Sequence, residues 1–314
     1  MKKIIVFFIA FIIMLISYIK KEVDNEIKII TYGSDKIIED ESLNNNIEKT
    51  TYIKINYNNE IIDIDLEEYV VGVVACEMPA SFNSEALKSM AVAARTFALY
   101  KIKNNKDYVM RTTVSDQCYH SIDKLKNKWG NSFESNYGKI KSAVEATKYE
   151  YMTYKDEIII SFYFSISNGY TENCENVFSQ KLDYLVSVNS DWDKEYNYKK
   201  DSVKIKISDF LKKLNINSSI INDIDIERSE TNRINYITIN NIKFKGSKFR
   251  SLLSLKSTDV DIRYDNEYVY INTSGYGHGV GMSQYGANSM ANNGFLYDEI
   301  LKYYYTGVKI VNKI

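Results

Sequence analysis

The sequence predicts an α+β fold in which helices and antiparallel strands form one domain, preceded by an N-terminal membrane helix. Three features predict it: an apolar run near the N-terminus, apolar residues at helical spacing from residue 66 onward, and several later strand-like segments. The 314 residues are 45% hydrophobic and 13% aromatic, which is enough apolar material for a sizeable core. The formal net charge of -1 gives no general electrostatic reason to bind nucleic acid, so we expect no such partner.

The membrane helix is predicted over residues 1–23. A pair of lysines precedes an apolar run over residues 4–19, and a second pair closes it without a small-residue cleavage pattern. As a helix this run spans about 24 Å, somewhat less than the ~30 Å hydrocarbon core, and lysine and tyrosine side chains at its ends can cover the difference. We therefore expect an uncleaved, single-pass anchor with the remainder outside the cytoplasm. A cleaved signal peptide is the alternative.

The segment over residues 24–49 is polar, charged and weakly periodic, which predicts an extracytoplasmic linker before a domain over residues 50–314. This domain begins with "TYIKINYNNEIIDIDL", whose alternating pattern around a central Asn-Asn pair predicts a β-hairpin. Further strands are expected in the segments 150–165, 203–207, 234–245 and 259–273.

Two consecutive helices are predicted after the hairpin. Apolar residues recur at helical spacing over residues 66–77, and Pro79, the only proline, ends this helix because it pushes Met78 out of the α region. Asn83 or Ser84 can cap a second helix that reaches about residue 102. Helices are therefore expected near the ends of the domain.

Glu77 is the candidate catalytic residue. It falls on or beside the apolar face in the last turn of the first helix, where the negative end of the helix dipole and apolar neighbours both raise the pKa of a carboxyl group. A proton held nearer neutral pH is what a general acid requires. The alternative is a half-exposed carboxylate that ends an ordinary helix.

Three further positions are candidates for a role at the site. Lys88 and Arg95 are seven residues apart on the second helix and share a face with small residues, so Arg95 can order Glu77 or hydrogen-bond a sugar. The alternative is tight helix packing in which Arg95 pairs with an acid. His278 lies in the glycine-rich "GYGHGVG", and its alternative role is that of a structural loop histidine. No serine occurs in a G-x-S-x-G context, which disfavours a Ser-His-Asp hydrolase.

The three cysteines, Cys76, Cys118 and Cys174, are too few and too widely spaced to define a disulfide framework. One pair and three free thiols are both compatible with the sequence. Cys118 and His120 are two residues apart, so on a strand they would share a face and could supply two ligands of a metal site. No matching pair of ligands is evident elsewhere in the sequence.

Several motifs resemble the stage II sporulation protein D family in order and spacing. They are "EEYVVGVVACEMPASFNSEALKSMAVAARTFAL", "SDQCY", "SNGYTENCENVF", "DYLVSV", "FRSLLSLKST" and "GYGHGVGMSQYGANSMANNGFLYDEILKYYYTGVKI". The resemblance covers roughly residues 50 to 312, and its first and last motifs are long and specific.

This resemblance implies a membrane-anchored lytic transglycosylase that acts during forespore engulfment. Such an enzyme cleaves the bond between N-acetylmuramic acid and N-acetylglucosamine in stem-peptide-free glycan strands of peptidoglycan and leaves a 1,6-anhydromuramic acid end. The resemblance assigns the catalytic role to Glu77, and because the nucleophile is the substrate's own O6 hydroxyl, no second carboxylate is required. The implied partners are the sporulation amidase, stage II sporulation protein P, and the membrane scaffold, stage II sporulation protein M. The implied location is the engulfing septal membrane of the mother cell.

The family motifs also imply substrate-binding residues along a long groove. These are Arg95, Lys88, Gln117, Tyr184, His278, Ser283, Gln284 and Tyr285.

One departure from the family concerns metal binding. Some relatives carry a Cys and a His just before the Gln-x-Tyr motif that can hold zinc, whereas Val114, Ser115 and Asp116 precede Gln117 here. We therefore predict no metal, no cofactor and an activity that chelators leave unchanged.

Two other functions remain open. One is a non-catalytic glycan binder that activates a peptidoglycan amidase, as related amidase enhancers are thought to do. The other is a muramidase that hydrolyses the same glycan with water and so yields reducing ends.

Overall fold

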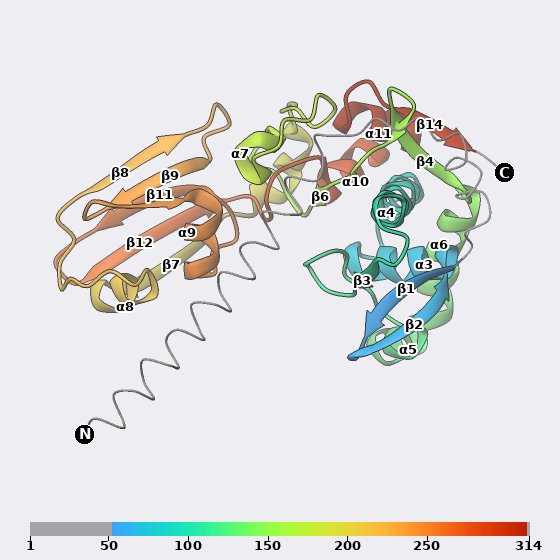
Figure 1. Ribbon diagram of the computed structural model, residues 1–314, viewed down its shortest axis with the longest axis horizontal. Helices are drawn as coiled ribbons and strands as arrows, with labels where there is room; N and C mark the ends of the chain where they lie inside the picture. The colour runs from blue at the N-terminus through green and yellow to red at the C-terminus, as the bar shows by residue number, and fades with distance from the viewer. Residues whose placement is uncertain (1–51, 313–314) are drawn as a thin grey trace. The chain divides into compact units, whose positions relative to one another are not determined.

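The computed structural model describes residues 52–312 of the chain (Figure 1). The predicted anchor over residues 1–23 and the predicted linker over residues 24–49 lie outside the described residues. Within 52–312, no helix combines the length and the apolar character needed to cross a membrane.

The domain is a mixed α+β structure, as predicted, and the strands of its described part form five small sheets. The predicted hairpin consists of β1 (Tyr52–Tyr57) and β2 (Glu60–Asp65), which pair antiparallel. Asn58 and Asn59 form the turn with φ of 53° and 68°, a left-handed conformation that asparagine tolerates better than most residues. β3 (Val109–Arg111) adds to the other edge of β1 in parallel.

The two predicted helices follow. α3 (Leu66–Glu77) is capped by Asp65, whose carboxylate accepts two backbone N–H groups of the first turn. The helix ends at Glu77, and Met78 is extended before Pro79 with φ -119° and ψ 144°, so the predicted stop is confirmed.

α4 (Ser84–Asn104) is capped by the side chain of Asn83 and runs two residues past the expected end. It lies at the centre of the larger apolar cluster (Figure 1), where α3, α6 (Phe133–Ala146), α10 (Gln284–Asn292), α11 (Tyr297–Tyr304) and β4 (Glu150–Tyr154) pack around it. Segments from both ends of the domain therefore enclose one helix.

A second apolar cluster lies in residues 207–271. One of its sheets has the order β11-β12-β7 and the other β10-β9-β8, and both are antiparallel throughout. Two helices, α8 and α9, pack on these sheets. The bounds are β7 (Asp201–Lys206), α8 (Ile207–Lys213), β8 (Ile224–Arg228), β9 (Ile234–Ile239), β10 (Ile242–Lys245), α9 (Gly246–Leu253), β11 (Asp259–Tyr264) and β12 (Tyr268–Ser274).

The strands differ from the prediction in two respects. β3 pairs with β1, and β13 (Met282–Ser283) with β6 (Tyr163–Phe164), in parallel, so the strands are not all antiparallel. The segment 150–165 divides into β4, β5 (Glu157–Ile158) and β6. Lys155 and Asp156, both with positive φ, turn the chain between β4 and β5, and β6 pairs with β13 instead. β4 also pairs with β14 (Lys309–Asn312) near the C-terminus.

Helices were expected near the ends of the domain, but the described structure also has helices in its middle. The additional ones are α5 (Ile122–Trp129), α6, α7 (Cys174–Phe178), α8 and α9, with 3-10 turns η1 (Gly130–Ser132) and η2 (Asp191–Lys199). α5 and α6 follow β3 and carry the chain back to α3 and α4.

Candidate active site around Glu77

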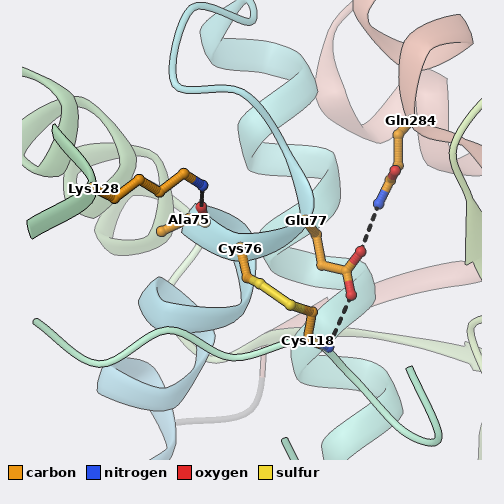
Figure 2. Close-up of a disulfide and its surroundings, with 6 residues drawn as sticks. All are labelled: Ala75, Cys76, Glu77, Cys118, Lys128 and Gln284. Carbon is orange, nitrogen blue, oxygen red and sulfur yellow. Dashed lines mark hydrogen bonds between the residues drawn. A yellow bond between two sulfur atoms is a disulfide. The ribbon is translucent and has the colours of Figure 1, made fainter. Parts of the chain in front are cut away.

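Glu77 is the last residue of α3, and its half-buried carboxylate is held by two donors from distant parts of the chain (Figure 2). Its Oε1 accepts the backbone N–H of Cys118 at 2.9 Å, and its Oε2 accepts the side-chain amide of Gln284 at 3.1 Å. The first donor follows β3, and the second begins α10. The carboxylate is therefore fixed at a point where three segments of the chain meet.

The environment raises the pKa of Glu77 above its ordinary value. Burial is the largest cause, while the hydrogen bonds from Cys118 and Gln284 favour the charged form and act in the opposite direction. The predicted direction is confirmed, and burial by neighbouring residues accounts for it. A proton on this carboxyl group is more firmly held than on an exposed glutamate.

Two tyrosine hydroxyls lie near the same carboxylate and are joined by Gln117. This buried side chain accepts a hydrogen bond from Tyr69 at 3.1 Å and donates one to the hydroxyl of Tyr163 at 3.1 Å and another to the carbonyl of Ala94 at 3.3 Å. Burial first, and then other charges that include Glu77, raise the pKa of both tyrosines. Both hydroxyls are therefore neutral at physiological pH.

Neither tyrosine was predicted from the sequence as a site residue. Tyr69 belonged to the apolar stripe of α3, eight residues before Glu77, and that spacing was the available signal. Tyr163 gave no such signal, because β6 reaches the site only through its parallel pairing with β13.

A disulfide lies beside the acid. Cys76 and Cys118 are joined with their Cα atoms 5.7 Å apart, which decides between the alternatives that the sequence left open (Figure 2). Cys174 is a buried free thiol. On the other side of Cys76, the Lys128 ammonium donates to the carbonyl of Ala75 at 3.4 Å.

Cys76, Cys118 and His120 bring their potential metal-ligand atoms within 4.8 Å of one another in the described part of the chain. Metal ligation by cysteine requires a thiolate, and here both sulfurs are joined in the disulfide. Burial, with smaller contributions from Lys124 and Lys128, lowers the pKa of His120 to about 4. One neutral imidazole does not make a metal site, so these residues do not fit a metal in the oxidised state.

The C-terminal motif places three predicted residues in different roles. Gln284 contacts Glu77 directly. Ser283 caps α10 and donates to the buried carboxylate of Asp193 at 2.7 Å, so it holds the helix that carries Gln284. The ring of Tyr285 lies edge-on between Phe82 and Tyr196, with centroids 4.9 and 4.6 Å away. Phe82 belongs to the loop that follows Glu77.

His278 occupies the structural role that was its alternative. Its Nδ1 accepts the N–H of Val280 at 3.1 Å, and its ring lies among three phenylalanines, of which Phe178 is nearest at 5.3 Å between centroids. Burial, with Arg250 as the next cause, lowers its pKa to about 3, so the ring is neutral. It lines a small cavity with Arg233 and Arg250, separate from the residues that contact Glu77.

Arg95 does not contact Glu77, contrary to the sequence-based expectation. It is fully buried and forms a bidentate pair with Glu67 in the first turn of α3, at 2.7 and 2.5 Å. It also donates to the carbonyl of Glu150 at 3.0 Å. The alternative interpretation, a packed arginine paired with an acid, is the one observed.

Lys88 and Tyr184 also lie away from Glu77. The ammonium of Lys88 pairs with Glu85 at 2.7 Å and lies 5.8 Å from the ring centre of Tyr297. The buried Tyr184 accepts the backbone N–H of Ile160 at 3.3 Å. In the described structure neither side chain hydrogen-bonds to Glu77, and their assignment to substrate stays a prediction, as does the long groove.

Known proteins resemble the chain over most of its length. A family model described as stage II sporulation protein matches residues 54–154, which include Glu77 and Gln117. Stage II sporulation protein D of Bacillus subtilis (strain 168) is 40% identical over 262 residues, which cover 81% of this chain and 76% of that protein. The protein of the same name from Bacillus amyloliquefaciens is 39% identical over 261 residues, with the same coverage. The amidase enhancer of Bacillus subtilis (strain 168) is 30% identical over 297 residues, which cover 77% of this chain and 40% of that protein.

Proposed function

The chain belongs to the stage II sporulation protein D family, and on this basis we propose that it is a membrane-anchored lytic transglycosylase. Its substrate is the stem-peptide-free glycan strand of peptidoglycan. It cleaves the bond between N-acetylmuramic acid and N-acetylglucosamine and leaves a 1,6-anhydromuramic acid end, during engulfment of the forespore.

The observation that carries the proposal is the state of Glu77. Burial raises the pKa of its carboxyl group, so a larger fraction is protonated than in an exposed glutamate. In the proposed reaction the protonated group donates to the glycosidic oxygen as the bond to C1 of the muramic acid breaks. The carboxylate that remains then accepts the proton of the O6 hydroxyl, whose oxygen attacks C1 and closes the anhydro ring. The acid is thereby regenerated, and no water is consumed.

The hydrogen bonds of Glu77 suit an acid that becomes a carboxylate during the reaction. Its partners are a backbone N–H and a carboxamide, and both are donors to the charged form. A glycosidase that uses two carboxyl groups needs the second one about 5 to 10 Å from the first to act as a nucleophile or as the base for water. The proposed nucleophile belongs to the substrate, so Cys118 and Gln284 need only hold Glu77 and stabilise its charge after proton transfer.

Replacement of Glu77 tests the proposal. Glu77→Gln keeps the shape of the side chain and cannot donate an acidic proton, so we expect the release of anhydro-ended fragments from amidase-treated glycan to fall at least about 10²-fold. Glu134→Gln, an exposed glutamate on α6, is the matched control and should retain full activity. Full activity of Glu77→Gln would contradict the proposal.

A second function, activation of an amidase without catalysis, is favoured by the relative whose name is amidase enhancer. The same variant separates the two functions. If the chain only binds glycan and stimulates an amidase, Glu77→Gln should leave stimulation of a purified peptidoglycan amidase intact, and the wild-type chain should release no anhydro ends.

The location and partners belong to the same proposal and rest on family membership and the sequence of the N-terminus. We place the chain in the engulfing septal membrane of the mother cell through residues 1–23, with stage II sporulation protein P and stage II sporulation protein M as partners. The amidase removes stem peptides and so supplies the substrate. Glycan that has not been treated with amidase should therefore be cleaved more slowly than treated glycan.

A further inference from the structure

The disulfide joins the two chain segments that hold Glu77 in place (Figure 2). Cys76 is the residue before Glu77 on α3. Cys118 is the residue whose backbone N–H donates to Oε1 of Glu77 at 2.9 Å. One covalent bond therefore links the backbone that carries the acid to the backbone that carries its hydrogen-bond donor, although 42 residues separate the cysteines in sequence.

From this arrangement we propose that the Cys76–Cys118 disulfide is a positioning element for Glu77, and that the oxidised chain is the active form of the enzyme. This inference rests on the function proposed above. Cys118 acts through Glu77 and is a positioning residue, not a catalytic one.

Other contacts keep the Cys118 segment near α3 without fixing its N–H on the carboxylate. The N–H of His120 donates to the carbonyl of Gly72 at 3.2 Å, and the ring of Tyr119 stacks on Tyr69 with centroids 5.6 Å apart. Gln117, the residue before Cys118, is held by side-chain hydrogen bonds to Tyr69 and to the carbonyl of Ala94. Opening the disulfide should therefore loosen the contact to Glu77 without unfolding the domain.

The redox step is a thiol-disulfide exchange with an external dithiol. The S–S bond between Cys76 and Cys118 breaks and both become thiols, while the dithiol is oxidised to its own disulfide; two electrons and two protons pass to the chain. Both cysteines are partly exposed, so a small dithiol can reach them, whereas Cys174 is buried.

Loss of the Cys118 hydrogen bond has two measurable consequences. The orientation of the acid is less well defined, so kcat should fall about tenfold or more. The lost donor had favoured the carboxylate, so the pKa of Glu77 should rise further. Because Glu77 acts in its protonated form, the alkaline limb of the pH-rate profile should move to higher pH. General destabilisation of the fold would lower the rate without moving this limb.

The test uses the full-length chain in detergent, in three states: as purified under oxidising conditions, reduced with dithiothreitol, and reoxidised after removal of the reductant. Release of anhydro ends from amidase-treated glycan is measured against pH in each state. We expect the rate to fall and the alkaline limb to shift upward on reduction, and both to recover on reoxidation. Cys174→Ala should respond as the wild type does. The double variant Cys76→Ser/Cys118→Ser should show the rate and the alkaline limb of the reduced state, and dithiothreitol should change neither.

A second measurement is independent of activity. The pKa of Glu77 is followed by NMR of chain labelled with ¹³C at the glutamate carboxyl, with Glu77→Gln to assign the signal, and it should be higher in the reduced state. An unchanged pKa and rate on reduction would overturn the inference, as would a purified active chain with three free thiols or with bound zinc in place of the disulfide. Absence of glycan cleavage in every redox state would contradict the proposed function alone, and the NMR result would still decide the positioning role.

Discussion

At Glu77, burial and hydrogen bonding act in opposite directions on one carboxyl group. Burial raises its pKa, and the donors from Cys118 and Gln284 lower it, with burial the larger effect. A general acid benefits from both, because it must hold a proton before bond cleavage and must be stabilised as an anion afterwards. The two donors therefore serve the second half of the proposed reaction.

Substitution of Gln284 should show this balance in the pH dependence. Gln284→Ala removes a donor that favours the carboxylate, so the pKa of Glu77 rises and the alkaline limb of the pH-rate profile moves to higher pH, while kcat falls about tenfold. Gln284→Glu should move the limb further up, since two carboxyl groups in contact disfavour a second charge. Limbs that coincide in wild type and both variants would contradict the assigned role of Gln284.

The sequence and the family motifs predicted Glu77, Gln117 and Gln284 as site residues. The structure joins Glu77 to Gln284 and joins Gln117 to two tyrosines near the acid. The partner of Arg95 could not be predicted from the sequence or the motifs. That arginine lies on the second helix and its acid, Glu67, on the first, so their pairing depends on how the two helices cross. Side-chain spacing along one helix carries no such information.

The pairing of α3 with α4 depends on the buried Arg95–Glu67 contact. Arg95→Ala would leave a carboxylate buried without its partner, so we expect the free energy of unfolding to fall by about 3–5 kcal/mol. Lys103→Ala, which removes a pair with the exposed Glu157, should cost less than about 1 kcal/mol in the same urea titration. A stable Arg95→Ala protein that has lost only activity would instead assign Arg95 to substrate.

The packing of residues 117–120 on α3 depends on Gly72. A Cβ there would lie 2.3 Å from Cε2 of Tyr119 and 2.8 Å from the carbonyl oxygen of His120. Gly72→Ala should therefore push the Cys118 segment away from Glu77, reduce the free energy of unfolding by about 1–3 kcal/mol and lower activity.

Gly138 on α6 provides the matched control for this substitution. No atom lies within 4 Å of a Cβ at that position, so Gly138→Ala should be neutral or stabilising, with activity unchanged. Equal activity and stability of the two alanine variants would show that the contact between α3 and the Cys118 segment does not matter.

Local chemistry predicted the ends of the first two helices well, because Pro79 and Asn83 act on their immediate neighbours. It did not predict α5, in which Leu125 alone is buried, or the parallel pairing of β6 with β13. A helix with so little apolar surface gives a weak pattern, and two-residue strands are defined by their partners rather than by their own sequence.

Across the whole described chain, polar contacts connect the parts around the two apolar clusters. Thr231, beside β9, accepts a hydrogen bond from Arg233 at 3.0 Å and donates one to Glu172, which precedes α7. Lys245 of β10 donates to the carbonyl of Val177 in α7 at 2.9 Å. Neither contact is predictable from the sequence, because its two partners come from segments that are about 60 or more residues apart.

Thr231→Val tests the contribution of this connection. It removes one hydroxyl that a buried guanidinium and a buried carboxylate share, so we expect a loss of about 1–3 kcal/mol in the free energy of unfolding in urea. Thr306→Val, at an exposed position near the C-terminus, should change stability by less than about 0.5 kcal/mol. Equal stability of the two variants would contradict the role given to Thr231.

The chemistry assigned to Glu77 is decided by the ends of the glycan fragments. The measurement is mass spectrometry of amidase-treated glycan digested by the full-length chain in ¹⁸O-labelled water. We predict fragments that end in 1,6-anhydromuramic acid, one water lighter than hydrolysis products and free of ¹⁸O, and their absence with Glu77→Gln. Reducing ends that carry ¹⁸O would show hydrolysis by water and contradict an intramolecular attack by the substrate's own hydroxyl.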